Sequence, residues 1–399
     1  MRRERDCRLV AGAVGLSALG DWVAIVALGL HVKQATGSGL AVAALWVCLF
    51  GPSVAVAGHA GLLVDRLEAT RLLAAVSAIG VAGAAGVALT GALVPVLVLT
   101  ALLGVVFAIT QPAEFALVPA LAGERGLQTA NGRMETARYL GFGAGPLLGG
   151  VLYAVGGLEL AMLVDAATFA AVAVAALLLR VRREPAQDDG APQRARDGIA
   201  FLFRDRVLAL AMAVAFAALL FMSAVWVAEL FFVQDVLGRG DLAYGLMLSV
   251  WTIGMALGAM LLSRRVAAGV VAVAGLAAVT VQGAGLALPA AFPAFGFFLA
   301  CMLAGGAAHG LKNVMFRTLI HVRVPERMHG RAFAAYNGIR NTAELGAFAA
   351  GGLLVAAIGA RGTVAYAGGL SALAGALGLI VLLRMRQTSN SEQPVPAGA

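Results

Sequence analysis

Charged residues are scarce in this sequence. Asp, Glu, Lys and Arg make up only 13% of its 399 residues, whereas 61% are hydrophobic and the mean hydropathy is +0.91. Soluble domains contain about 25% charged and about 45–50% apolar residues. A soluble fold could not bury so much apolar surface, and the same composition excludes a disordered chain. A polytopic membrane protein is therefore predicted.

Cysteine and lysine are also rare. The three cysteines, Cys7, Cys48 and Cys301, lie far apart and form no CxxC pair, so neither a disulfide framework nor a metal site is expected. Only Lys33 and Lys312 are lysines, and the arginines are spread between apolar runs. The net charge of +8 therefore forms no basic stripe of the kind that binds nucleic acid, and no nucleic-acid partner is expected.

Motifs for ATP hydrolysis and covalent catalysis are absent from the sequence. A phosphate-binding GxxxxGK[ST] loop needs a glycine directly before its lysine, but Val32 precedes Lys33 and Leu311 precedes Lys312. The sequence contains no GxSxG and no HExxH either. We therefore expect a protein that is not an enzyme and holds no cofactor. Its work would be driven by an ion gradient, with the proton gradient as the candidate, or by the substrate's own gradient.

Twelve long apolar segments account for most of the chain. A helix that crosses a bilayer core of about 30 Å needs about 20 mainly apolar residues, whereas barrel strands would be about ten residues of alternating polarity. Transmembrane helices are therefore predicted, the first of them retained rather than cleaved as a signal peptide. The segments are residues 9–31, 39–64, 71–90, 93–119, 134–156, 158–180, 207–236, 242–263, 267–288, 293–316, 331–357 and 362–384.

The basic residues alternate between the two sides of the predicted membrane. If the amino terminus lies inside, only Lys33, Arg239 and Arg361 fall in outer connections, and almost all others fall at inner ones. Positively charged connections remain cytoplasmic. Both termini are therefore predicted to be cytoplasmic, and the heavy use of Ala, Arg and Gly points to a bacterial cytoplasmic (inner) membrane.

The two halves of the chain resemble each other. Arg138 precedes the pair Gly149-Gly150 by the same interval as Arg340 precedes Gly351-Gly352. The fifth apolar segment is therefore predicted to repeat as the eleventh. This predicts two parallel six-helix halves. The predicted organisation is an N-terminal bundle over 1–180, a cytoplasmic linker over 181–206, a C-terminal bundle over 207–384 and a disordered cytoplasmic tail over 385–399.

The loop after the second segment resembles the GxLaDRxxRR signature of the major facilitator superfamily. It reads GLLVDR from Gly61 to Arg66 and continues to Arg71. The resemblance implies that Gly61 packs against the eleventh helix and that Asp65 lies near the positive amino-terminal end of that helix. Arg66 would be a charge partner in the same loop. The alternative is an ordinary charged helix end.

The fifth segment resembles the GxxxGPxxGG signature of proton-coupled exporters in the same superfamily. It contains Gly141, Gly145, Pro146, Gly149 and Gly150. Glycines four residues apart form a flat face for close helix approach, and the proline removes a backbone hydrogen bond, which predicts a kink. A tight, bent seam suits two bundles that rock without leaking. Simple packing of small residues is the alternative.

The resemblance extends over nearly the whole chain. The stretches 20–22, 112–119 and 324–333 look like the branch that contains enterobactin-type siderophore exporters and macrolide and tetracycline efflux permeases. This implies an all-α integral membrane fold of twelve transmembrane helices in two pseudo-symmetric six-helix bundles. In one departure, residues 102–118 lack the arginine that many drug/proton antiporters carry in the fourth helix, so any proton relay must use other residues.

Acidic residues inside the apolar segments are the candidate coupling residues, since a charge at the bilayer centre costs at least about 2.5 kcal/mol. Asp21 lies about 20 Å along its helix from Arg8, near mid-membrane. It would accept a proton or bind a cation, and a structural carboxyl is the alternative. Glu229 lies among aromatic residues and would bind an amphipathic cation. Asp165 is expected to be structural.

Two further acids have predicted partners. Glu344 follows Arg340 by four residues, so the two are expected to pair on one helix face. Glu114, near the inner end of the fourth segment, is expected to contact Arg138 or Lys312 as a gate or packing contact. The histidines are scattered and are expected to be hydrogen-bonded residues rather than proton relays.

Together these features predict a transporter that exports a small hydrophobic or amphipathic compound in exchange for protons. The compound would be a drug, an antibiotic or a siderophore-like metabolite. The protein is expected to be monomeric in the lipid bilayer, with the substrate and protons as its partners. An importer or uniporter of a small polar solute is the first alternative, and a membrane protein without a transport role is the second.

Overall fold

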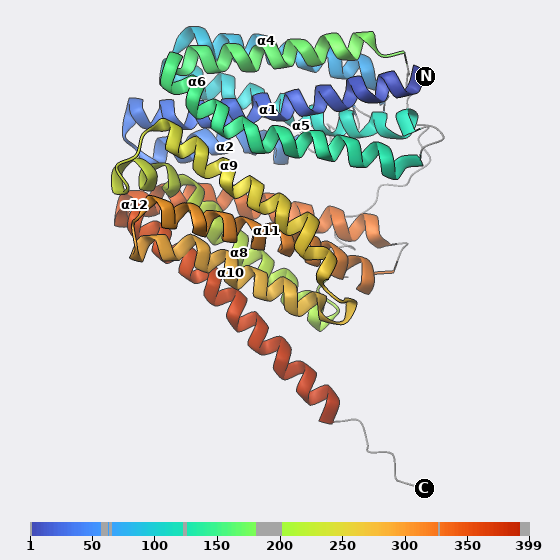
Figure 1. Cartoon of the computed structure of the whole chain (residues 1–399), viewed down its shortest axis with the longest axis vertical. Helices are drawn as coiled ribbons and strands as arrows, with labels where there is room; N and C mark the ends of the chain where they lie inside the picture. The colour runs from blue at the N-terminus through green and yellow to red at the C-terminus, as the bar shows by residue number, and fades with distance from the viewer. Residues whose placement is uncertain are drawn as a thin grey trace. The chain divides into compact units, whose positions relative to one another are not determined.

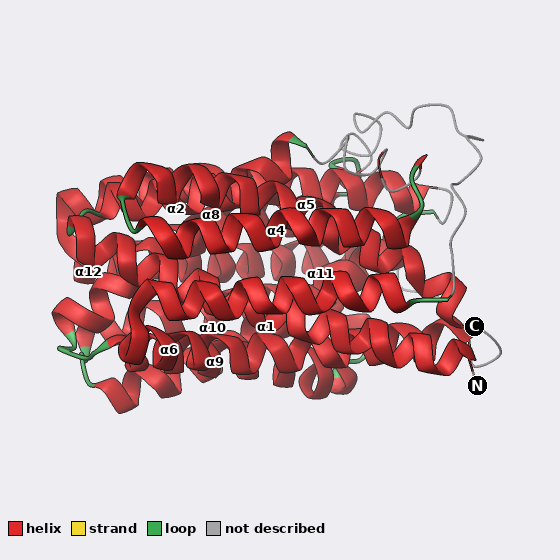
Figure 2. Cartoon of the chain, turned by 90° about the horizontal axis from the view of Figure 1, so that it is seen from above, coloured by secondary structure: helices red, strands yellow, loops and turns green. Residues whose placement is uncertain are grey.

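The computed structural model describes residues 2–56, 63, 66–122, 126–180, 202–325 and 328–391. These residues form helices joined by short turns, and no strand occurs among them (Figure 2). Long apolar runs favour this arrangement because a helix satisfies its backbone hydrogen bonds internally, as lipid requires. The predicted all-α fold class is confirmed.

The amino-terminal half contains five described helices (Figure 1). Four are single helices, and the fifth, α6, holds two of the predicted segments. They are α1 (Arg2–Thr36), α2 (Gly39–Ala55), α4 (Ala69–Thr90), α5 (Leu93–Ala122) and α6 (Gly126–Leu178).

The carboxy-terminal half repeats this pattern, and its last helix, α12, also holds two predicted segments. Short π-helical and 3-10 turns extend α8 and α9. The elements are α8 (Arg206–Phe231), η2 (Phe232–Val236), α9 (Asp241–Leu257), η3 (Gly258–Leu262), η4 (Ser263–Arg265), η5 (Ala268–Val270), α10 (Val271–Ala291), α11 (Phe295–Arg323) and α12 (His329–Ser391).

Glycine turns divide α6 and α12. Gly157 has φ 63° and Gly359 has φ 70°, left-handed values that glycine adopts readily and that end one helix before the next begins. The two glycines follow Arg138 and Arg340 at the same interval, which supports the predicted repeat. Among the described residues, nine helices are long and apolar enough to cross a membrane, and α2 is a shorter apolar helix. With α6 and α12 divided, the described part of each predicted segment lies mainly on a helix.

One predicted boundary differs from the structure. Residues 385–391 continue α12 to Ser391 instead of beginning a disordered tail. Met385, Arg386 and Gln387 are good helix formers, and Arg386 donates a hydrogen bond to the Gly269 carbonyl at 3.0 Å. Most of the predicted linker lies outside the described residues, but Leu202 is fully buried in an apolar core.

The chain forms two compact units. The first comprises Met1–Gly190, Val227–Thr252 and Phe348–Ala360, and the second comprises Ala191–Trp226, Ile253–Ala347 and Arg361–Ala399. The first unit therefore includes parts of α8, α9 and α12 in addition to the amino-terminal helices. The predicted division at residues 181–206 stays a prediction.

Each unit has its own apolar core. In the first unit α1 packs along α6, and α4 packs against α5 and α6 (Figure 1), with Leu73, Leu117 and Met134 buried between them. In the second unit α10 packs on α11, and Phe316 and Ile320 are fully buried. Large apolar side chains are also exposed along the helices, as expected for surfaces that face lipid. Examples are Leu89, Leu140, Val155 and Leu177.

Candidate functional site

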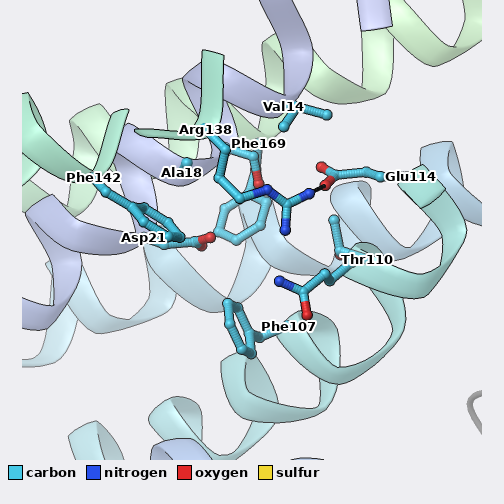
Figure 3. Close-up of a pocket in the computed structure, with 11 residues that line it drawn as sticks. Val14, Ala18, Asp21, Phe107, Thr110, Glu114, Arg138, Phe142 and Phe169 are labelled. Carbon is cyan, nitrogen blue, oxygen red and sulfur yellow. Dashed lines mark hydrogen bonds and ion pairs between the residues drawn. The ribbon is translucent and has the colours of Figure 1, made fainter. Parts of the chain in front are cut away.

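Two adjoining cavities in the first unit share the side chain of Asp21. This residue lies in the middle of α1 and is partly buried. One cavity is also lined by Glu114 of α5 and Arg138 of α6 (Figure 3). The other is also lined by Asp165 of α6. The structure thus gathers three carboxyl groups and one guanidinium from three helices.

Arg138 and Glu114 form a buried ion pair. Arg138 Nη2 lies 3.2 Å from Glu114 Oε2, and the two side chains are only 9% and 6% exposed. Figure 3 shows the Arg138 side chain extending toward Glu114, with Asp21 on its other side. Arg138 also interacts electrostatically with Asp21. The predicted contact between Glu114 and Arg138 is confirmed.

Asp165 enters the site because α6 packs closely on α1 at Gly20. A Cβ atom at Gly20 would lie 2.7 Å from Asp165 Oδ1 and would also meet Thr168. Asp165 is 1% exposed, and its charge interacts with that of Asp21. Its Oδ1 has no hydrogen-bond partner among the described residues. The sequence analysis missed this role, although an acid inside an apolar segment was a usable signal.

The glycine-rich face of α6 lies directly against α1. A Cβ atom at any of three of its glycines would come within 3.0 Å of an α1 carbonyl oxygen, closer than ordinary van der Waals contact. The predicted flat face for close helix approach is confirmed. The contacts are Gly141 with the Gly15 carbonyl at 2.6 Å, Gly145 with Leu19 at 2.8 Å and Gly149 with Val23 at 3.0 Å.

Pro146 lies where α6 meets α9. The backbone of α6 leaves helical values at Gly157 and not at Pro146, so the helix continues through the proline. The hydroxyl of Thr252 lies 3.1 Å from the Phe142 carbonyl, and Leu147 N–H donates to Ser249 Oγ at 3.0 Å. Side chains of α9 thus lie within hydrogen-bonding distance of the α6 backbone groups on either side of Pro146.

The two Gly-Gly pairs of the repeat make comparable helix contacts. A Cβ atom at Gly150 would lie 2.9 Å from the Asp241 carbonyl oxygen of α9. A Cβ atom at Gly352 of α12 would lie 2.9 Å from the Gly39 carbonyl oxygen of α2. In both cases a helix from one half of the sequence closely approaches a helix from the other half, within the first unit.

A polar network joins the end of α1 to η2, α6 and α9. Lys33 Nζ lies 2.5 Å from Asp235 Oδ1 in η2. Gln34 donates to Asp241 at 3.2 Å, and its amide oxygen accepts a hydrogen bond from the Tyr153 hydroxyl at 2.9 Å. These residues come from four elements, so their association could not be seen in the sequence.

The signature loop lies largely outside the described residues, which do not include Gly61 and Asp65. Arg66 and Arg71 are described and exposed. Glu68 accepts hydrogen bonds from the N–H groups of Thr70 and Arg71 at 3.2 and 3.3 Å, so it caps the start of α4. The roles implied for the loop stay predictions.

In the second unit, Arg340 Nε lies 3.1 Å from Glu344 Oε1, so the predicted pair is confirmed. The two repeat-related arginines therefore differ in their partners, because Arg340 binds an acid on its own helix. Nearby, His309 lies 3.2 Å from both Gln282 and Lys312. Lys312 is 3% exposed, which makes this a buried polar cluster.

Glu229 does not line either of the cavities that Asp21 lines. It is 4% exposed, and its charge interacts with Tyr244 of α9. His31 is hydrogen-bonded to the Gly91 carbonyl at 2.7 Å, and His329 to the Val324 carbonyl at 2.8 Å. These two histidines are thus in hydrogen-bonded positions, as expected.

Comparison with known proteins identifies similarity at the levels of sequence and fold. The family model described as Major Facilitator Superfamily matches residues 10–345. No curated protein matches the chain. Among solved structures, the nucleoside transporter NupG has a TM-score of 0.74 at 15% identity, covering 96% of this chain and 99% of its own.

Two other solved structures are similar over nearly their whole length. A bacterial homologue of the iron transporter ferroportin, in an inward-facing state, has a TM-score of 0.70 at 17% identity, with 95% of this chain and 98% of that chain covered. The human organic anion transporter MFSD10 (TETRAN) has a TM-score of 0.65 at 16% identity, with 95% and 100% covered. At these identities the likeness shows a common fold and does not identify the substrate.

Proposed function

Since the chain belongs to the major facilitator superfamily and is a multi-pass membrane transporter, we propose that it exports a small hydrophobic or amphipathic compound in exchange for protons. The observation that carries the proposal is the position of Asp21. It lies midway along a membrane helix and lines two cavities. One of them has both polar and apolar walls, and the walls of the other are apolar except for Asp21 and Asp165. Ionisable groups inside a membrane are costly and mark ion or substrate pathways.

In the proposed cycle Asp21 takes up a proton from one side of the membrane and releases it on the other. Substrate and proton compete for the cavities, so binding of one favours release of the other. Arg138 lies between Asp21 and Glu114, so protonation of either acid would remove one of the negative charges that face its guanidinium. The Gly145–Pro146 seam keeps the closed state tight, and Asp65 and Arg66 stabilise one conformer. The protein works in a bacterial cytoplasmic membrane with both termini inside.

The proposal is tested in two steps. A compound panel is first screened for reduced accumulation in an efflux-deficient bacterial host that expresses the chain. Transport of the compound found is then measured in inside-out vesicles with an imposed proton gradient, using wild type and Asp21→Asn. The variant should lose gradient-driven transport while its amount in the membrane is unchanged.

The matched control for this experiment is Glu159→Gln. Glu159 is an exposed acid of the same unit, next to the turn at Gly157. The Glu159→Gln variant should transport the compound like the wild type. Uphill transport by Asp21→Asn at the wild-type rate would remove this carboxyl from the mechanism.

A second candidate is uptake of a small polar solute. It is favoured by the buried cluster of Gln282, His309 and Lys312, which could hydrogen-bond a polar substrate. NupG, a nucleoside transporter, has a similar fold. Uptake of radiolabelled nucleosides into right-side-out vesicles separates the two candidates, because an exporter would accumulate its substrate only in inside-out vesicles.

A further inference from the structure

We propose that the end of α12 and the turn between η4 and α10 form a binding site for an anionic phospholipid. The polar part of this site is made by Arg264, Arg265 and Arg386, which we call the arginine cluster. All three residues belong to the second unit. The inference needs the membrane setting of the chain and does not depend on the substrate or on the direction of transport.

The arginine cluster lies where candidate membrane spans reach the same side of the membrane. Arg265 is the last residue of one candidate span, and the next begins at Val271. Arg386 is the second-last residue of another. Its Nη2 donates a hydrogen bond to the Gly269 carbonyl at 3.0 Å, so the end of α12 lies beside the turn that follows Arg265. The cluster is therefore at the level of the lipid headgroups.

The turn between η4 and α10 is compact, which keeps the three guanidinium groups near one another. The short step from Arg265 to Gly269 spans at most about 14 Å even when the chain is extended. The N–H of Val270 donates to the Ala267 carbonyl at 3.1 Å, so the chain folds back within this step. Because Arg386 holds the Gly269 carbonyl, its charge adds to those of η4.

Carboxylates are missing from the sequence around the cluster. No Asp or Glu occurs in residues 242–325 or 345–391, which contain the turn and the end of α12. The three arginines are exposed, and none of them forms an ion pair with a residue that the structure describes. By contrast, the exposed Arg8 lies 3.0 Å from Glu4. The cluster is thus a local excess of positive charge that an anion complements.

The chemistry of the guanidinium group favours a phosphate as this anion. A guanidinium presents N–H groups in a planar fork, which matches two phosphate oxygens at once. Anionic lipids attract arginines that lie near the membrane surface. A zwitterionic lipid carries a positive group beside its phosphate, and the arginines repel this group. The cluster should therefore prefer a lipid whose head has a net negative charge.

Exposed apolar side chains adjoin the cluster on its membrane side. Leu261 is 53% exposed and precedes Arg265 by about one helical turn. Leu383 is 45% exposed and precedes Arg386 in the same way. Residues one turn apart lie on the same side of a helix, so each leucine lies deeper in the membrane than its arginine. An acyl chain would cover these leucines, whereas a soluble phosphate would leave them bare.

The test measures the binding of defined lipids to the full chain, purified in detergent. Dioleoylphosphatidylglycerol is the anionic probe, and dioleoylphosphatidylcholine has the same acyl chains with a zwitterionic head. Glycerol 3-phosphate supplies a phosphate head without acyl chains. Native mass spectrometry counts the bound molecules during each titration. The wild type should bind the anionic lipid about 10-fold or more tightly than the zwitterionic one, since each arginine near an anionic lipid contributes about fivefold.

The variants locate the binding to the cluster. Arg264→Gln, Arg265→Gln and Arg386→Gln combined in one chain should abolish the preference for the anionic lipid, and each alone should reduce it by about fivefold. The matched control is Arg8→Gln, which removes an exposed arginine whose charge is already balanced by Glu4. This control should keep the full preference.

Three results would overturn the proposal. The first is equal affinity of the wild type for the two lipids, and the second is an unchanged preference in the triple variant. The third is binding of glycerol 3-phosphate as tight as that of the anionic lipid, which would indicate a site for soluble phosphate. If the triple variant does not fold, Arg264→Gln decides the matter, because this side chain is exposed. An unchanged preference in that variant would equally overturn the proposal.

Discussion

Thr252 of α9 places its hydroxyl 3.1 Å from the backbone carbonyl of Phe142 in α6. In an uninterrupted helix this carbonyl would accept a hydrogen bond from the residue four positions later, which here is Pro146 and has no N–H. The same hydroxyl lies 2.9 Å from the Leu248 carbonyl of its own helix. It also lies 3.0 Å from the Ser249 carbonyl, so its single proton has three possible acceptors. A side chain from the other half of the sequence is thus placed to donate to the carbonyl that the proline leaves without a donor.

Thr252→Val should lower the stability of the protein by about 0.6 kcal/mol, the average for hydrogen bonds between membrane helices. Thermal unfolding in detergent measures the change. Pro146→Ala supplies the control, because it restores an N–H for the Phe142 carbonyl. In that background Thr252→Val should cost less, and equal costs in both backgrounds would show that the Thr252 hydroxyl does not serve this carbonyl.

Gly145→Leu should prevent close packing of α6 on α1 and so slow transport or block folding. Even a Cβ atom there would lie 2.8 Å from the Leu19 carbonyl oxygen and 2.7 Å from Trp22 Cβ. Overpacking of this kind costs about 1–3 kcal/mol. Folded yield and transport rate measure the effect. Ala144→Leu is the matched control, since Ala144 is exposed on the same helix. A fully active Gly145→Leu would contradict the tight seam.

Breaking the ion pair of Arg138 and Glu114 should be strongly destabilising. Removal of one partner leaves the other as an uncompensated buried charge, which costs about 3–5 kcal/mol. Arg138→Gln alone should therefore lower the melting temperature sharply. The double variant with Glu114→Gln should recover much of the loss, because Glu114 is then no longer an unpaired buried charge. If the loss in the double variant equals the sum of the losses in the two single variants, the two residues are not coupled.

Asp205 should make the second unit sensitive to acid. Burial raises the pKa of Asp205, but the Leu208 N–H and Arg323 outweigh this and hold the pKa below its ordinary value of 3.8. The carboxylate accepts from Leu208 at 2.8 Å and from Arg323 at 2.7 Å. A lowered pKa means that the stabilisation is present above the ordinary value and is lost as the pH falls through the lower folded value.

Asp205→Asn should keep the helix cap and lose only the charge. We expect a loss of at most about 1 kcal/mol near neutral pH, since the ion pair with Arg323 is partly exposed to solvent. The melting temperatures of wild type and variant should converge as the pH falls below the ordinary pKa. Parallel curves down to the most acidic pH would contradict the assigned ion pair.

Several features of the fold and the candidate site could be predicted because they depend on local chemistry. A run of apolar residues predicts a membrane helix wherever it occurs, and glycines four residues apart predict close packing. Arg340 and Glu344 pair because their spacing puts them on one helix face. Glu114 and Arg138 were predicted to meet because buried charges need partners, although Lys312 was an equal alternative.

Other features depended on which helix packs against which. Asp165 becomes part of the site only because Gly20 lets α6 approach α1. The partners of Pro146 come from α9, and nothing in the proline segment identifies them. The polarity of residues 385–391 predicts a disordered tail, but α12 continues through them to Ser391. The first three are good helix formers, and Arg386 is held by the Gly269 carbonyl, a contact that the sequence does not reveal.

The membrane setting, the number of apolar segments and the internal repeat follow from the order of residues alone, since hydropathy and spacing act along the chain. Which carboxyl groups share a cavity is a property of three-dimensional packing. Asp21, Glu114 and Asp165 come from three separate segments, and their electrostatic interactions arise only when α1, α5 and α6 lie side by side. Burial then turns isolated acids into a coupled group, because charges interact strongly only where water is excluded.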